Sequence, residues 1–329
     1  MENDNILNAR QFLQEKFKEF PLPSQSYLIF MIPRTGSNLM ATHLQDIGFG
    51  KPFEAFHFNH TVIQNEYGWE IDFNDPVAYM KQAITSQTVN GIFGMKLNWS
   101  QRGTFFQIAH ALLGGYNSTL TDMEIFETFF PNPKFIYMKR LNKVRQAVSY
   151  SKGKQTGIWQ VRKSQSEDYK EYVLPPVYNR AHIESCLEEL LADNASWENY
   201  LRKNDIQFLE VWYEDLDRDF VGEMKKIYAY LNIEIPNVNA PSTKKQANAK
   251  TQNWVDRFVS DTPWLNDPKL RRSLNDGDFQ TMYLQRTRML IEAKERKAWN
   301  SIPAIRLKPL RWFFFRGKKK LQQLINSNK

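Results

Sequence analysis

A run of apolar residues that ends in a short polar turn constrains the fold of this chain more than any other feature. The six apolar residues at 27–32 predict a buried strand. The turn at 33–37 holds proline, arginine, glycine and two small hydroxyl residues, and apolar residues at helical spacing follow it over 38–46. The first N–H groups of a helix lack acceptors and the helix dipole is positive there, so this turn favours binding of an anion, above all phosphate. Arg34 adds a planar cation with several donors.

Three further apolar segments predict strands, and helical stretches separate all four strands. Strands that alternate with helices predict an α/β fold with a doubly wound parallel sheet and flanking helices. Ligands of such sheets bind at the carboxyl ends of the strands, so the residues just after each strand are candidates for function. The three additional strands are expected at 91–97, 134–138 and 206–213, and the four strand ends at 34–38, 98–101, 139–142 and 214–217.

Charge and cysteine content limit the class of protein and its compartment. The 329 residues carry a net charge of +8, which suits an anionic ligand, a membrane surface or nucleic acid without choosing among them. The single cysteine, Cys186, excludes internal disulfides, fits a reducing cytoplasm, and is expected to be a buried small hydrophobe. The N-terminus predicts an amphipathic helix over 5–20 instead of a signal peptide, and no run approaches the roughly 20 apolar residues that span a bilayer. A cytoplasmic protein is therefore expected.

The C-terminal tail is both aromatic and basic. Residues 312–315 are one tryptophan and three phenylalanines, and arginine and lysine flank them. One interpretation is contact with the headgroups of an anionic membrane, which would bring the protein to the inner face of the membrane. The other is that the aromatic side chains pack on the domain or on a second subunit. The predicted organisation is a single domain over 1–300 and a tail over 301–329.

The turn at 33–37 matches neither of two common nucleotide-binding patterns. The Walker A string is absent, and the pair Gly48 and Gly50 lacks the third glycine of the dinucleotide fingerprint. A second basic position follows the strand at 134–138: Arg140 stands at its end, and Ser149 comes nine residues later on a predicted helix. The two strand ends together would suit a nucleotide that carries phosphates at two separate places.

These positions resemble the sulfotransferases that use 3′-phosphoadenosine 5′-phosphosulfate (PAPS). The segment 33–39 matches their 5′-phosphosulfate loop, P-[KR]-[ST]-G-[ST]-x-[LW], and Arg140 with Ser149 matches their 3′-phosphate motif. The chain is most similar to the bacterial Stf-zero (trehalose 2-sulfotransferase-like) family, whose resemblance extends over about 27–258, the predicted PAPS core. The other segments that carry the resemblance are 50–56, 94–99, 147–151, 155–159, 213–216 and 254–258.

The resemblance implies roles for individual residues in sulfuryl transfer. Glu54 is implied as the general base, and the phenylalanines around it are expected to desolvate its carboxylate and raise its pKa. Arg34 is implied to stabilise charge on the leaving phosphate, and Lys96 either faces the transferred sulfuryl group or is a surface lysine. PAPS would be the donor and PAP the product. The other residues implied to bind the donor are Pro33, Thr35, Gly36, Ser37, Asn38, Arg140, Ser149 and Lys245.

The expected acceptor is a hydroxyl group of a carbohydrate, a glycolipid or another small molecule. No nucleic-acid partner is expected, because no nucleic-acid motif is present. Glu54, His57 and His60 at three-residue intervals could form a metal face on a helix, but no fourth ligand and no H-E-x-x-H pattern accompanies them, and sulfuryl transfer from PAPS needs no metal, so none is expected. The family resemblance also implies a homodimer. Two alternatives from the residues are a non-catalytic basic protein that binds phosphate or membrane, and a nucleoside-triphosphate kinase or hydrolase. The candidate acceptor-binding residues are Lys51, Phe53, Phe56, His57 and Trp69.

Overall fold

The structure, a computed structural model, describes residues 4–57, 59–114, 120–159, 174–234, 238, 249–274, 279–283 and 285. Its contacts divide the chain into two compact units, and each is described by itself. The first consists of Met1–Arg140, Thr156–Pro175 and Leu201–Gln246, and the second of Leu141–Gln155, Pro176–Tyr200 and Ala247–Lys329. The predictions for Lys245 and for the aromatic tail lie outside the described residues. A single domain over 1–300 stays a prediction.

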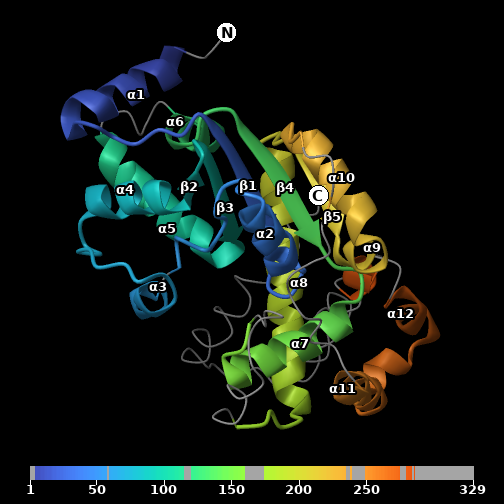
Figure 1. Cartoon of the computed structure of the whole chain (residues 1–329). Coiled ribbons are helices and arrows are strands. Elements are labelled where there is room, and N and C mark those ends of the chain that lie inside the picture. Colours follow the sequence, from blue (N-terminus) through green and yellow to red (C-terminus); the bar gives the residue numbers. More distant parts are fainter. Residues whose placement is uncertain are drawn as a thin grey trace, which may run out of the picture. The chain divides into compact units, whose positions relative to one another are not determined.

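A twisted sheet with strand order β2-β3-β1-β4-β5 forms the centre of the first unit (Figure 1). β1 pairs in parallel with β3 and β4, and β4 pairs in parallel with β5. These four strands correspond to the four predicted ones, so the predicted α/β fold with a parallel sheet is confirmed. The short antiparallel β2 at the edge was not predicted, since two residues carry no periodicity. The strands are β1 (Gln25–Met31), β2 (Thr88–Val89), β3 (Ile92–Asn98), β4 (Pro133–Lys139) and β5 (Phe208–Trp212).

The order of the strands reverses between β1 and β4. After β1 the chain forms β3 on one side of it, and later returns to form β4 on the other side. Ligands of open α/β sheets bind at such a reversal, outside the carboxyl ends of the strands. β1 leads into the turn at 33–37 and β4 leads into Arg140. The fold therefore brings the predicted anion-binding turn and the second predicted basic position to neighbouring strand ends.

Helices cover both faces of this sheet, as Figure 1 shows for α5 on one side and α10 on the other. The face formed by Tyr27, Ile29 and Met31 packs against apolar side chains of α2, α9 and α10. The opposite face packs against the aromatic side chains of Phe126 in α6 and of Phe130, which directly follows α6. The helices of the first unit are α1 (Asp4–Phe17), α2 (Ser37–Asp46), α3 (His60–Tyr67), α4 (Pro76–Gln87), α5 (Trp99–Leu113), α6 (Asp122–Phe129), α9 (Tyr213–Arg218) and α10 (Phe220–Leu231).

The second unit is helical in its described part. Cys186 is 1% exposed there, and burial raises the pKa of its thiol to about 11, as expected for a buried small hydrophobe. Across the described ranges of both units, no helix combines the length and the apolar character needed to cross a membrane. The helices that lie wholly or mostly in this unit are α7 (Lys143–Thr156), α8 (Arg180–Lys203), α11 (Ala249–Ser260), the 3-10 helix η3 (Pro263–Asn266) and α12 (Pro268–Ser273).

An aromatic cluster around Phe105 holds α5 and α6 against the sheet. The ring of Phe105 is fully buried and stacks on Phe126 and Phe130 with centroid distances of 4.9 and 5.5 Å. It also meets Phe56 edge-on at 5.2 Å. Aromatic pairs at these distances add to the free energy gained from burial alone. The cluster therefore supports both the sheet and the segment that carries Glu54.

Phe105→Ala is expected to lower the free energy of unfolding by about 3–5 kcal/mol, because it leaves a cavity in a close-packed core. Urea denaturation followed by circular dichroism would measure the loss. Phe208→Ala is the matched control, since the same substitution removes a side chain that is 36% exposed. A loss at Phe105 no greater than at Phe208 would contradict the structural role of the cluster.

Candidate active site

The turn after β1 has a backbone conformation that directs it into α2. Arg34 and Gly36 both lie in the left-handed region, with φ of 68° and 80°. Gly36 is the N-cap of α2, and its carbonyl accepts from Leu39 N and Met40 N at 2.9 and 3.3 Å. The N–H groups that come before these two precede the first hydrogen bonds of the helix. The predicted anion cradle is thus a turn of alternating backbone conformation at a helix N-terminus.

Tyr213, the first residue after β5, closes the turn from the side. A Cβ atom on Gly36 would lie 2.7 Å from Cδ2 of Tyr213, so only glycine fits without movement of the ring. Thr35 is fully buried, and its Oγ1 donates to the carbonyl of Ile32 at 3.0 Å. These contacts fix the path of the turn before any ligand binds.

Arg140 joins the end of β4 to the same turn. Its Nη1 donates to the carbonyl of Arg34 at 2.9 Å, and its guanidinium lies 4.2 Å from the centroid of the Tyr213 ring. Its Nε lies 3.8 Å from Oε1 of Glu214, and its side chain is 7% exposed. The Arg34 guanidinium donates to the carbonyl of Trp159 at 2.6 Å. Two arginines from neighbouring strand ends therefore belong to one cluster.

The two guanidinium groups destabilise each other's charge. Burial, and next the positive charge of Arg140, lower the pKa of Arg34 to about 10. Arg34 thus stays protonated at neutral pH, but its protonated form is less favourable than in water. An anion bound at the turn would offset this repulsion. The electrostatics therefore favour the predicted role of the turn as an anion site.

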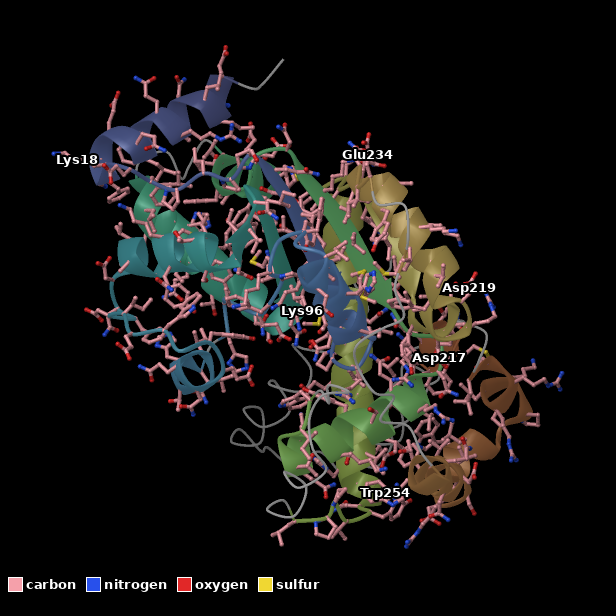
Figure 2. The ribbon with its side chains drawn as sticks, in the orientation of Figure 1. Lys18, Lys96, Asp217, Asp219, Glu234 and Trp254 are labelled. Carbon is pink, nitrogen blue, oxygen red and sulfur yellow. The ribbon has the colours of Figure 1, made fainter. Side chains whose placement is uncertain are left out.

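The sheet register places Glu54 beside Lys96. Phe53 forms a parallel bridge with Met95, and the N–H of Lys96 donates to the carbonyl of Phe53 at 3.0 Å. Lys96 pairs with Ile29 and therefore faces the side of the sheet that α2 covers. Its Nζ donates to Oε1 of Glu54 at 3.1 Å and also to the side-chain oxygen of Asn38. Lys96, labelled in Figure 2, is 5% exposed and thus is not a surface lysine.

Gln101 holds the other oxygen of the Glu54 carboxylate. Its Nε2 donates to Oε2 of Glu54 at 2.7 Å. Burial alone would raise the pKa of Glu54, but the charge of Lys96 and the hydrogen bonds from Gln101 and Lys96 outweigh it and lower that pKa. The Glu54 side chain is 28% exposed, so part of it remains open to solvent.

The expectation that phenylalanines raise the pKa of Glu54 was wrong. Phe53 packs against Tyr67 with a centroid distance of 4.0 Å, and Phe56 lies in the aromatic core. Neither separates the carboxylate from its cation and amide donor. The electrostatic environment of Glu54 is therefore set by specific polar partners, which favour an ionised carboxylate at neutral pH.

The candidate acceptor-binding residues divide into exposed and buried ones. Lys51 is exposed, and His57 is partly exposed with its Nδ1 accepting from Asn59 N at 3.0 Å. Phe53 is buried, at 7% exposed. Phe56 is 0% exposed and Trp69 is 3% exposed. Because these two rings contact other core side chains, they support the segment and are not carried into the acceptor site proposed below.

His57 and His60 do not share a helical face with Glu54. α3 begins at His60, whose ring stacks on Phe73 at 4.4 Å, and His57 precedes the helix. No group of three metal-ligating side chains is found within the described ranges. Ser149 lies on α7 and is partly exposed, and its predicted contribution to the 3′-phosphate site stays a prediction.

Sequence reasoning missed three residues of this site, namely Gln101, Tyr67 and Tyr213. Gln101 belongs to a strand-end segment that had been singled out, and its spacing from Asn98 is that of a capping box, a readable signal. Tyr213 belongs to the segment 213–216, which carries the family resemblance, but it was given no role of its own. No sequence signal indicates that Tyr67 stacks on Phe53, because that contact depends on how the loop folds.

Comparison with known proteins identifies the class. The family model described as Stf0 sulphotransferase matches residues 26–261, from β1 to just past the end of α11. The chain therefore belongs to the Stf0 sulphotransferase family and is a transferase enzyme. The resemblance inferred from its motifs is confirmed.

Two curated relatives cover most of the chain. A trehalose 2-sulfotransferase of Mycobacterium tuberculosis is 24% identical over 265 residues, which is 74% of this chain and 97% of the relative. A trehalose 2-sulfotransferase of Mycolicibacterium smegmatis is 24% identical over 259 residues, which is 72% of this chain and 95% of the relative. The similarity thus extends over nearly the whole length of both relatives.

Lys96→Met is expected to destabilise the fold in a pH-dependent manner. In the wild type the pKa of Glu54 is lowered, so its contribution to stability is present above the unfolded value of 4.5 and is lost as the pH falls through the folded value. Without Lys96, burial dominates and the ionised form is penalised. The difference in free energy of unfolding between the two proteins should therefore grow from pH 4 to pH 7, as measured by urea denaturation.

Lys139→Met provides the control for this measurement. Lys139 pairs with Glu210 at 3.2 Å, but the Glu210 side chain is 41% exposed. Exposed ion pairs contribute little, so this variant should show almost no such pH dependence. Equal pH dependence in both variants would contradict a special pairing between Lys96 and Glu54.

Proposed function

We propose that this enzyme transfers the sulfuryl group of PAPS to a hydroxyl group of a carbohydrate, with Glu54 as the general base. The observation that carries this proposal is the contact of Lys96 with both Glu54 and Asn38, which joins a carboxylate to the anion-binding turn. Both curated relatives are named for action on trehalose, so a disaccharide of this kind is the first acceptor to test. A glycolipid that carries such a sugar is the second.

The residues around the turn fit an anionic nucleotide donor. The left-handed Gly36 lets the backbone of residues 35–38 approach an anion closely, and Arg34 and Arg140 supply two positive charges. PAPS, when bound, supplies an activated sulfuryl group and a phosphate leaving group. Arg34 and the backbone amides would hold the 5′-phosphosulfate, and Arg140 the 3′-phosphate. The proposal also includes contacts of Pro33, Ser149 and Lys245 with the donor, which rest on the family resemblance alone.

The proposed role of Glu54 follows from its remaining hydrogen-bonding capacity. Lys96 and Gln101 occupy one position on each carboxylate oxygen, which leaves lone pairs that can accept the proton of an acceptor hydroxyl. Glu54 would take this proton as the hydroxyl oxygen bonds to sulfur and the bond from sulfur to the phosphate oxygen breaks. Arg34 and Lys96 would stabilise the negative charge that builds on the leaving oxygen.

The acceptor is proposed to bind on the side of Glu54 where side chains are exposed. Lys51 and His57 offer polar groups there, and the partly exposed ring of Tyr67, which stacks on the buried Phe53, offers apolar surface. The proposal includes a homodimer, which the resemblance implies. It also includes a cytoplasmic location and membrane contact of the tail, which composition indicates. Membership of a sulfotransferase family disfavours the alternative of a non-catalytic binding protein.

Glu54→Gln is expected to lower turnover by a factor of about 10²–10⁴, because the amide cannot accept the proton of the acceptor hydroxyl. Transfer of ³⁵S from labelled PAPS to trehalose, and to a panel of mono- and disaccharides, would measure it. Binding of PAP should persist, as calorimetry would show. Turnover equal to that of the wild type would remove Glu54 from the proposal.

PAP is expected to stabilise the protein selectively against heat. A ligand at 100 times its Kd adds about 2.7 kcal/mol, whereas ATP and RNA should add far less. Differential scanning fluorimetry with the three ligands in parallel would compare them. Arg34→Ala should lose most of the PAP effect, while Lys226→Met, which removes a 67% exposed side chain on α10, should retain it. Equal stabilisation by ATP would favour a nucleoside-triphosphate enzyme instead.

A further inference from the structure

We infer that Gln101 is a positioning residue for the general base, fixing the plane of the Glu54 carboxylate so that its accessible lone pairs face the acceptor. This inference rests on the proposed role of Glu54. Gln101 lies in the first turn of α5, directly after β3, and is 1% exposed. It makes no direct contact with the anion-binding turn among the hydrogen bonds described, so it would act through Glu54 alone.

The orientation of the Gln101 amide is determined by its two contacts. Its Oε1 accepts from the backbone N–H of Asn98 at 3.1 Å, and its Nε2 donates to Oε2 of Glu54 at 2.7 Å. The reversed orientation would place the amide NH₂ against the Asn98 N–H and the amide oxygen against the carboxylate. Both contacts would then be repulsive. The side chain therefore presents a donor to Glu54 and an acceptor to the start of α5.

The residue type also indicates a role beyond the helix cap. The third position of a capping box takes glutamate or glutamine, since either supplies the acceptor for the backbone N–H. α6 shows the glutamate form, where Glu124 accepts from Thr121 N at 2.7 Å. A glutamate at 101 would cap α5 equally but would place a second carboxylate against Glu54. The amide donor of glutamine is what the base requires.

The carboxylate of Glu54 is held from both sides. Lys96 of β3 donates to Oε1 at 3.1 Å and Gln101 of α5 donates to Oε2 at 2.7 Å. The other titratable groups that face it are His57, whose charged form would lower its pKa, and Tyr67 of α3, whose own pKa is raised by burial and by the Glu54 charge. Lys96 alone would leave the carboxylate free to rotate about one hydrogen bond. The second contact restricts that rotation.

The test compares Gln101→Leu and Gln101→Glu with the control Glu124→Leu. Gln101→Leu removes both contacts, and Gln101→Glu keeps the cap acceptor but replaces the donor to Glu54 with a carboxylate. Glu124→Leu removes the equivalent cap acceptor of α6, and no hydrogen bond described links Glu124 to Glu54. The pH profile of kcat/KM with PAPS and trehalose, or the most active sugar of the panel, is one readout. The second is the ¹³C titration of Glu54 in glutamate-labelled protein, assigned by its loss in Glu54→Gln.

Both Gln101 variants should shift the acidic limb of the profile and the Glu54 titration upward by roughly one pH unit, because a hydrogen bond to a charged group is lost. The shift should be larger in Gln101→Glu, which adds a like charge. Glu124→Leu should leave both curves in place. An unchanged Glu54 titration in both Gln101 variants would overturn the inference, even if kcat fell.

The same experiment separates this inference from the proposed function. If Glu54→Gln retained full turnover, the proposal that Glu54 is the base would fail. The inference would then fail with respect to catalysis, although the titration would still show whether Gln101 holds the carboxylate. If Glu54→Gln lost turnover and the titration did not respond to Gln101, only the inference would fail.

Discussion

The buried ammonium group of Lys96 is the interaction on which the site depends. An unpaired ammonium in a protein interior costs several kcal/mol, so a lysine that is 5% exposed requires polar partners. Lys96 has them in Glu54 and Asn38, which come from the loop before α3 and from α2. One charge on β3 thus connects the candidate base to the predicted anion-binding turn. The backbone bridge between Phe53 and Met95 makes this geometry possible, because it aligns the loop with the strand.

Much of the fold could be predicted because its signals are local. Four apolar runs bounded by turns and helices gave four parallel strands, and a turn containing Arg34 and Gly36 indicated where an anion would bind. The antiparallel β2 lacked such a signal, since strand pairing over two residues depends on the neighbouring chain. The positions of the strand ends, where function was predicted, follow from the same local signals.

The electrostatics of the site could not be predicted because they depend on residues far apart in the chain. Glu54 is held by Lys96 and Gln101, which lie 42 and 47 positions away. The sequence shows the phenylalanines next to Glu54, and their proximity suggested a raised pKa. In the folded chain Phe56 turns into the core, and the polar partners outweigh burial. Aromatic neighbours in sequence are therefore poor indicators of the environment of a carboxylate.

The ring of Tyr213 has a consequence for how this site tolerates change. It lies against Gly36, and the guanidinium of Arg140 lies 4.2 Å from its centroid. The segments that follow β1, β4 and β5 therefore meet at one side chain. Gly36 and Arg140 both contact the ring of Tyr213, so the effects of substitutions at these three residues on the free energy of unfolding should not add. A lineage that replaced the tyrosine would relax the turn and the arginine together. The stability of the turn at 33–37 and the position of the Arg140 guanidinium are therefore coupled through one aromatic ring.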